Sequence, residues 1–318
     1  MNAPNLNIVT GAFSYIGKYI TQRLLKMGER VKTLTGYRNR PNPFGDQVVA
    51  APFNFDNPSE LAMSLEGAST LYNTYWVRFP YGQMTFQKAI QNTLTLINAA
   101  KDAGVSRIVH VSITNPSEGS PLPYFNGKAV LEKEIIQSGL SYAIIRPSVV
   151  FGDEDILINN IAWFLRKFPV FVIPDLGQYK LQPVYVEDVA EIAVQAGHQT
   201  ANTIIDAAGP EIYSYEDLIK LIRDTIGSKA YIIYVPTSIA LFCSKVLGLL
   251  VNDVVLTREE IDGLMTGLLV SNLPPTGKAL FSDWIKQNAN TIGTRYSSEM
   301  ERHYHRDTPL SPPLIRGD

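Results

Sequence analysis

Apolar runs with the length of β-strands alternate with amphipathic helical patterns through the first half of the chain. The helical patterns include 85–103, which stops at Gly104, and 125–138, which stops at Gly139. Such alternation predicts an α/β fold, a Rossmann-type doubly wound parallel sheet with helices on both faces. The predicted strands are 6–9, 31–35, a segment within 48–55, 69–73, 107–112 and 142–145.

The rhythm changes after Gly152. A helix is expected over 156–168, a short strand feeding a helix at 184–189, and a strand at 203–207. We therefore predict a Rossmann domain over 1–210, with part of the substrate lobe inserted around 153–181. A smaller, mostly helical C-terminal lobe that binds substrate or a partner is expected over 211–318.

The stretch 231–254 is unusually apolar. Lys245 interrupts it, and Pro236 and Gly248 are expected to limit any single helix, so it falls short of a membrane span. One interpretation is a helix that lines a pocket or packs on the other lobe. The alternative is that the apolar segment 239–251 docks on a membrane surface or on a protein partner.

Composition narrows the function. A net charge of -2 and a pI near 6.1 disfavour nucleic acid as a partner. The single cysteine, Cys243, and the scattered histidines give no disulfide framework and no metal-ligand spacing, so no metal site is expected. The N-terminus shows no signal core, which predicts a cytoplasmic location, with peripheral membrane association as the alternative. The oligomeric state is not predicted.

The segment 10–17, Thr-Gly-Ala-Phe-Ser-Tyr-Ile-Gly, lies between the first predicted strand and its helix. Gly11 permits a sharp turn, and Gly17 lets the helix pack closely on the strand. A pyrophosphate would then bind the free N–H groups at the helix N-terminus. The usual middle glycine is replaced by Ser14, whose hydroxyl would donate to a phosphate. We predict contacts with a dinucleotide along this turn, from Gly11, Phe13, Ser14, Tyr15, Ile16 and Gly17; the alternative is a βα unit that binds no nucleotide.

Charge indicates which dinucleotide is preferred. An acid at the end of the second strand would bind the 2′-hydroxyl of NAD, but Thr35-Gly36-Tyr37 contains none. Arg38 and Arg40 follow, and a guanidinium suits a 2′-phosphate. NADP(H) is therefore preferred and NAD(H) is the alternative, unless both arginines are only solvated loop residues.

Tyr124 and Lys128 lie four residues apart, on one face of the predicted helix. An ammonium beside a phenol lowers the tyrosine pKa, which suits a proton exchange with a carbonyl or hydroxyl substrate. Ser112, or Thr114, would polarise the same oxygen at the end of the fifth strand. The alternative is an ordinary tyrosine at an exposed helix start.

The glycine turn, Ser112, Tyr124, Lys128 and the segment 146–152 together resemble the short-chain dehydrogenase/reductase superfamily, in its extended and atypical branches. The likeness is to the NAD-dependent epimerase/dehydratase and NmrA-like groups, over about the first 210 residues. The resemblance implies that Pro147 and Val150 lie near the nicotinamide. It also implies that Thr74 and Tyr75 flank the ribose, and that Phe55 and Asp56 contact the adenine side.

The run from Arg146 to Asn159, and that from Gln182 to Val186, are similar to the branch that contains the 39-kDa-type accessory subunit of complex I. This resemblance implies a protein that holds NADPH tightly without known turnover.

Two functions follow. The first is an oxidoreductase or epimerase-like enzyme acting on a small molecule, with Tyr124 as acid/base, Lys128 as tuning group and ribose anchor, and Ser112 as orienting group. Trp76, Phe79, Tyr81 and Trp163 would shape its pocket, or are ordinary core residues. The second is a non-catalytic, NADPH-holding redox sensor or assembly subunit.

Overall fold

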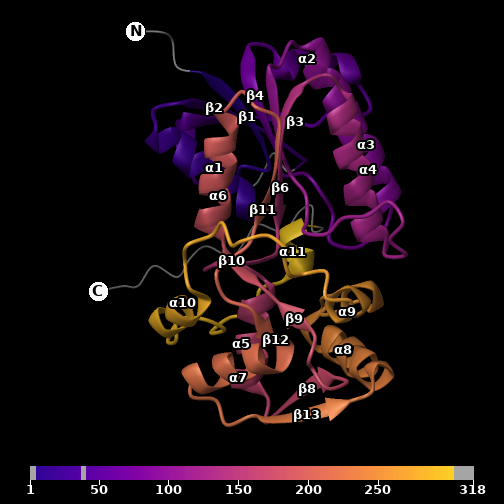
Figure 1. The fold of residues 1–318 in the computed structure, drawn as a ribbon, viewed down its shortest axis with the longest axis vertical. Coiled ribbons are helices and arrows are strands. Elements are labelled where there is room, and N and C mark those ends of the chain that lie inside the picture. The colour runs from indigo at the N-terminus through magenta and orange to yellow at the C-terminus, as the bar shows by residue number, and fades with distance from the viewer. Residues whose placement is uncertain (1–4, 37–40, 304–318) are drawn as a thin grey trace.

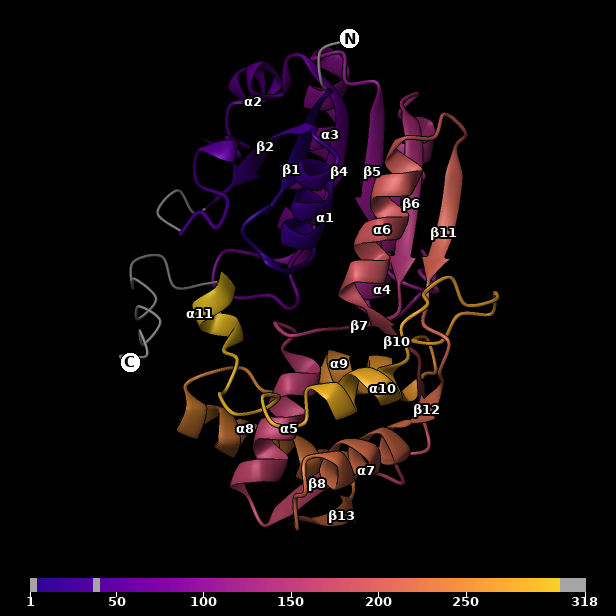
Figure 2. The ribbon, with the colours of Figure 1, turned by 90° about the vertical axis from the view of Figure 1, so that its left-hand side faces the viewer.

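The computed structural model describes residues 5–36 and 41–303. Its large lobe is built on a seven-stranded sheet in the order β11-β6-β5-β4-β1-β2-β3, with every neighbouring pair parallel (Figures 1 and 2). The strands are β1 (Leu6–Thr10), β2 (Arg30–Thr35), β3 (Val48–Pro52), β4 (Ala68–Asn73), β5 (Arg107–Val111), β6 (Ser141–Pro147) and β11 (Thr203–Ala207).

Helices cover both faces of this sheet (Figure 1). Helices α1 (Tyr15–Lys26) and α6 (Val186–Gly197) pack together on one face. Helices α2 (Pro58–Leu65), α3 (Phe86–Asp102) and α4 (Pro123–Gln137) cover the other, and a short 3-10 helix (Gly45–Gln47) precedes β3. The predicted Rossmann-type α/β fold is therefore confirmed.

Local chemistry explains where these elements begin. Asn57 accepts a hydrogen bond from the Glu60 N–H, and Pro58 is the first residue of α2, where its missing N–H costs no hydrogen bond. All five residues of β5 are buried, as expected for a central parallel strand. Its one charged side chain, Arg107, donates to the carbonyl oxygens of Ala196 and Ala201, at 2.9 and 2.8 Å. These bonds satisfy the buried guanidinium.

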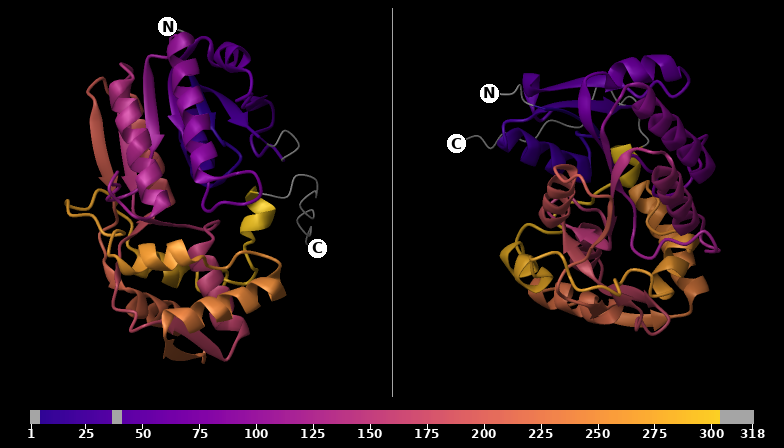
Figure 3. Two further views of the ribbon diagram at one scale, coloured as in Figure 1. Left: turned by 90° about the vertical axis from the view of Figure 1, so that its right-hand side faces the viewer. Right: turned by 45° about the horizontal axis from the view of Figure 1, so that its top comes forward.

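The small lobe lies at the carboxyl edge of the sheet (Figures 1 and 3). It has its own apolar core, in which Phe151, Phe281 and Trp284 pack against one another. The lobe and its connections contain β7 (Val149–Phe151), α5 (Leu157–Lys167), β8 (Val170–Pro174), β9 (Lys180–Leu181), β10 (Pro183–Tyr185), β12 (Tyr213–Ser214), α7 (Tyr215–Thr225), β13 (Tyr231–Val235), α8 (Thr237–Val251), α9 (Arg258–Met265), α10 (Phe281–Gln287) and α11 (Glu299–His303).

The apolar stretch 231–254 differs from its expectation. Its first part is strand β13, which pairs in parallel with β8, and the helix α8 begins only after Pro236. Gly248 does not end that helix; a Cβ there would lie 2.6 Å from the Asp253 carbonyl oxygen, so glycine allows a close approach.

Docking of the 239–251 segment on a membrane surface finds no support in the structure. Among residues 5–36 and 41–303, helices fall short of the length and apolarity that crossing a membrane requires. Helix α8 is nevertheless exposed along one side, where Phe242 and Leu249 are 67% and 84% exposed. Its opposite side packs within the small lobe, where Ala240 and Ser244 are buried and Leu247 packs against the apolar core. The exposed side leaves the partner-docking face as a prediction.

Replacing Leu71 by Ala is expected to lower the free energy of unfolding by about 2–5 kcal/mol, because this β4 side chain is fully buried under α2 and α3. Urea denaturation measures the loss. Val49→Ala, on the edge strand β3 where the side chain is 64% exposed, is the control and should cost less than about 1 kcal/mol. Equal losses would contradict the placement of Leu71 in the core.

Candidate functional site

The glycine turn joins β1 to α1 at the carboxyl edge of the sheet. Gly11 has φ +67°, a conformation that L side chains rarely adopt, and a Cβ on Gly17 would lie 2.4 Å from the Gly11 carbonyl oxygen. Ser14 is the N-cap of α1, but its hydroxyl makes no capping hydrogen bond. The first-turn N–H groups of α1 thus have no side-chain cap, which is the condition for binding an anion.

A cavity of about 1430 Å³ opens from this turn and extends between the two lobes. Its wall includes the ends of β2, β3 and β4 on one side, and residues of α9 and α11 on the other. This volume exceeds that of an ordinary drug-sized pocket, roughly 300–1,000 Å³. From the predicted cofactor set, the cavity is lined by Gly11, Phe13, Ser14, Tyr15, Phe55, Asp56, Thr74, Tyr75 and Val150.

Other predicted contacts lie behind this wall. Ile16 and Gly17 belong to α1, and Pro147 ends β6, where its carbonyl oxygen accepts from the Thr114 N–H at 3.1 Å. Thr35 and Gly36 line the cavity at the end of β2. Arg38 and Arg40, on which the NADP(H) preference depends, lie outside the described residues.

Three aromatic rings form one end of the cavity. Phe53 and Phe55 are stacked with centroids 4.8 Å apart, and Tyr75 lies 5.1 Å from each. Such flat apolar surfaces are suited to contact a purine ring. The expected adenine-side position of Phe55 and Asp56 is thus compatible with the geometry, and their role remains a prediction.

A buried polar network fixes the ends of the central strands, and the sequence analysis missed it. The Thr74 N–H donates to Thr10 Oγ1 at 2.7 Å, and Thr10 Oγ1 donates to Asn73 Oδ1 at 3.2 Å. Asn73 Nδ2 lies 3.0 Å from His110 Nδ1. Burial lowers the pKa of His110 well below its ordinary value, so this ring is neutral. An alternating strand pattern shows that such polar positions exist, but it does not show that they meet.

The predicted Tyr124–Lys128 pair is arranged differently from its expectation. Burial raises the pKa of Tyr124, and the carboxylate of Glu260 raises it further; it is not lowered toward neutrality. Lys128 is buried, and its Nζ donates to the Val111 carbonyl oxygen at 2.8 Å. The same Nζ lies 4.7 Å from the centre of the Trp76 ring. Burial lowers the pKa of Lys128 to about 7, so near neutral pH it carries a reduced positive charge.

Trp76 occupies the helix face that the two side chains were expected to share. Its ring centroid lies 5.7 Å from that of Tyr124, and a Cβ on Gly127 would lie 2.9 Å from the ring. Tyr124 lines the cavity, whereas Lys128 and Ser112 are absent from its described wall. Ser112 is buried just beyond β5, and its hydroxyl has no hydrogen-bond partner among the described residues. Trp163 packs in the small-lobe core, and the cavity wall contains Trp76, Phe79 and Tyr81.

Comparison with known proteins places this architecture. A family model described as the NmrA-like family matches residues 6–244. The chain belongs to the NmrA-like family. The resemblance stated from the glycine turn and the 146–152 segment is therefore confirmed at the level of the family.

Members and structural neighbours of this NmrA-like chain differ in what they do. The mitochondrial NADH dehydrogenase (ubiquinone) 1 alpha subcomplex subunit 9 of Arabidopsis thaliana is 26% identical over 284 residues, which cover 83% of this chain and 70% of that protein. The NADPH-dependent quinone oxidoreductase of Escherichia coli, solved with NADPH, has a TM-score of 0.70 and 18% identity, covering 89% of this chain and all of the other. Citrobacter sp. triphenylmethane reductase with NADP(H) also has a TM-score of 0.70 and 18% identity, and the match covers 88% of this chain and 99% of that protein. The solved structures show a shared fold.

The lowered pKa of Lys128 predicts that stability rises with pH. From about 7 up to the ordinary value of 10.5, the unfolded chain binds more protons at this site than the folded one. The free energy of unfolding therefore gains up to about 1.4 kcal/mol per pH unit across this window, and loses it as the pH falls toward 7. Urea unfolding of the wild type and of Lys128→Met from about pH 7 to about pH 9.5 tests this. The wild type should gain relative to the variant, and a difference independent of pH would contradict the assignment.

Proposed function

We propose that this NmrA-like protein binds a nicotinamide dinucleotide in the cavity between its lobes, NADP(H) in preference to NAD(H). The observation that carries this proposal is the glycine turn, whose uncapped helix N-terminus opens into a cavity of dinucleotide size. The aromatic trio suits the adenine end, and Val150 and Tyr124 lie on the wall available to the nicotinamide. The preference for NADP(H) rests on the absence of an acid at Thr35 and Gly36 and on the arginines Arg38 and Arg40 that follow in the sequence.

The dinucleotide is proposed to serve as a tightly held group in a non-catalytic protein. When bound, a nicotinamide supplies hydride chemistry. Proton exchange with a substrate would require a phenol made more acidic by its lysine, yet burial raises the pKa of Tyr124 and Trp76 lies against both residues. The relationship to a mitochondrial NADH dehydrogenase subunit supports a role within a protein assembly, and it leaves the predicted cytoplasmic location without support.

A reductase is the second candidate, and one observation favours it. Tyr124 lies on the cavity wall with Trp76, Phe79 and Tyr81, so an aromatic substrate would be enclosed beside it. The quinone and triphenylmethane reductases show that this fold accommodates such chemistry in other proteins.

A matched pair of glycine substitutions tests the binding site. Gly11 and Gly28 both have positive φ, +67° and +78°, so alanine strains each backbone similarly. Of these two glycines, Gly11 lines the cavity, whereas a Cβ at Gly28 meets nothing within 4 Å. Gly11→Ala is expected to weaken NADPH binding about tenfold or more, and Gly28→Ala to leave it unchanged, in a fluorescence titration. Equal affinities would contradict the placement of the dinucleotide at this turn.

Tyr124→Phe separates the two candidates. For a held group, NADPH copurifies with the protein, exchanges slowly against excess NADP⁺, and behaves the same in the variant. Turnover with a panel of quinones should also be absent in both proteins. Quinone reduction by the wild type that falls at least about a hundredfold in Tyr124→Phe would instead establish the reductase.

A further inference from the structure

The C-terminal segment that leads into α11 rises from the small lobe, and α11 lies between the two lobes (Figure 2). Asn160 of α5 makes reciprocal hydrogen bonds with the backbone of Ser297, at 3.0 and 2.8 Å. The carboxylate of Asp253 accepts from the Glu299 and Met300 N–H groups, at 2.8 and 3.1 Å. Both sets of hydrogen bonds lie at the start of α11, so they fix the direction in which the helix leaves the small lobe.

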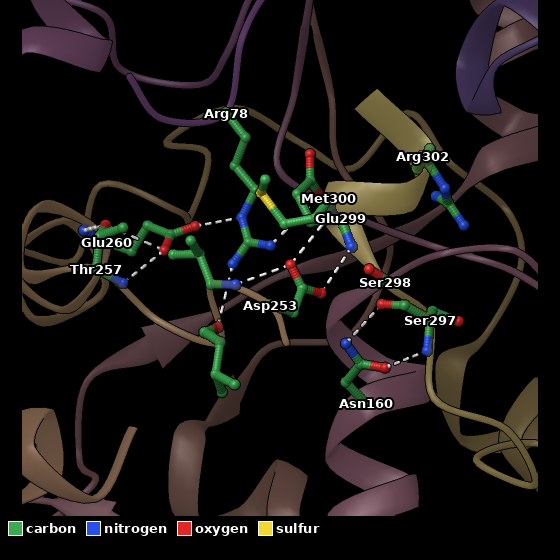
Figure 4. Close-up of polar contacts among 12 residues, drawn as sticks. Arg78, Asn160, Asp253, Thr257, Glu260, Ser297, Ser298, Glu299, Met300 and Arg302 are labelled. Atoms are coloured by element: carbon green, nitrogen blue, oxygen red, sulfur yellow. Dashed lines mark hydrogen bonds and ion pairs between the residues drawn. The ribbon is translucent and has the colours of Figure 1, made fainter. Parts of the chain in front are cut away.

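Arg78 ties the same helix to the large lobe. It lies in the loop after β4 and pairs with Glu260 of α9 at 2.5 Å and with Glu299 of α11 at 3.4 Å. Its Nη2 also donates to the Val255 carbonyl oxygen at 3.3 Å. Figure 4 shows this guanidinium between the two carboxylates. Helix α11 is therefore held from both lobes at the cavity wall.

This arrangement of α11 positions the Arg302 side chain near the glycine turn. It lines the cavity together with Gly11, Ser14 and Tyr15, and its guanidinium carbon lies 5.9 Å from the centre of the Tyr15 ring. Its Nη2 donates to the Glu154 carbonyl oxygen at 2.6 Å. One such bond to a neutral acceptor uses a fraction of the donors of a guanidinium. Its charge also acts on the carboxyl groups of Asp155 and Glu299, whose pKa values it lowers against the opposing effect of burial.

Of the cations on the described cavity wall, Arg302 is the one best placed to meet an anion near the glycine turn. Within the described cavity wall, the cations are Arg78, Lys88 and Arg302, and the first is paired with two carboxylates while Lys88 is exposed on α3. Lys18 of α1 pairs with the Glu154 carboxylate. Asp155 also lines the cavity, but burial raises the pKa of its carboxyl group to about 7, which reduces its repulsion of an anion.

We propose that Arg302 binds the pyrophosphate of the dinucleotide from the side opposite the glycine turn. The inference deepens the proposed function and rests on it. The pyrophosphate would lie between the N-terminus of α1 and this guanidinium, and the two favour negative charge in the same place. Because α11 is anchored to the small lobe, release of the dinucleotide then requires Arg302 to withdraw or the lobes to separate.

Arg302→Gln in the full-length protein tests the assignment, with Arg295→Gln as the control because Arg295 is an exposed arginine of the same segment. The dissociation constants of NADPH and NADH are measured by fluorescence. Losing a charge-assisted hydrogen bond should weaken both about tenfold or more and by the same factor, since both contain the pyrophosphate. Arg302→Lys should recover part of the loss, and Arg295→Gln should lose nothing.

Three outcomes overturn the proposal. Unchanged affinity in Arg302→Gln removes the residue from the site. A loss confined to NADPH assigns it to the 2′-phosphate instead. A wild type that binds neither dinucleotide refutes the proposed function and this inference with it, whereas either of the first two leaves the proposed function standing.

A second variant moves Arg302 without altering it. Asp253→Asn retains the shape of the side chain but weakens its acceptance of the Glu299 and Met300 N–H groups, so it loosens the start of α11. NADPH release, followed by chase with NADP⁺, should accelerate several-fold while circular dichroism keeps its wild-type form. An unchanged release rate would overturn the proposed role of the α11 anchor.

Discussion

The close approach of α1 to β1 is the constraint on which the cleft depends. A Cβ on Gly17 would overlap the Gly11 carbonyl oxygen, so glycine alone lets this helix begin directly above the strand end. That position places the α1 N-terminus at the carboxyl edge of a sheet whose other strands end at the same edge. The buried bonds among Thr10, Thr74 and Asn73 then hold the ends of β1 and β4 together. A ligand at this edge meets a backbone that is already in place.

Much of this could be predicted from the chain, because the signals are local. Glycine turns, N-caps such as Asn57 and Ser214, and apolar strand runs each depend on a few neighbouring residues. The expected ordering of the Rossmann elements therefore survives in the structure. The strand at 231–235 could not be predicted in this way, because its strand character depends on pairing with β8, some sixty residues earlier in the chain.

The candidate site shows the same division between features set by neighbouring residues and features set by tertiary contacts. The positions of Tyr124 and Lys128 on one helix could be predicted from their spacing. Their electrostatics could not, because these depend on Trp76, which comes from the loop after β4 and reaches α4 where Gly127 leaves room. Sequence reasoning treats a lysine near a tyrosine as a charge, whereas burial here lowers the lysine pKa and raises that of the tyrosine. A motif therefore specifies proximity along a helix, and the tertiary environment specifies the chemistry.

A dinucleotide held from both lobes would couple their packing to its own affinity. The contacts of Arg78 with Glu260 and Glu299 join the lobes across the cavity, and a ligand bound to groups on each side would strengthen that closure. Linkage is reciprocal: a partner whose binding shifts α9 or α11 would change the affinity for the dinucleotide by a certain factor. The dinucleotide would change the affinity for that partner by the same factor. A held cofactor would in this way report the state of the small lobe without any turnover. That coupling gives a physical reason for a non-catalytic member of this family to keep an intact dinucleotide cleft.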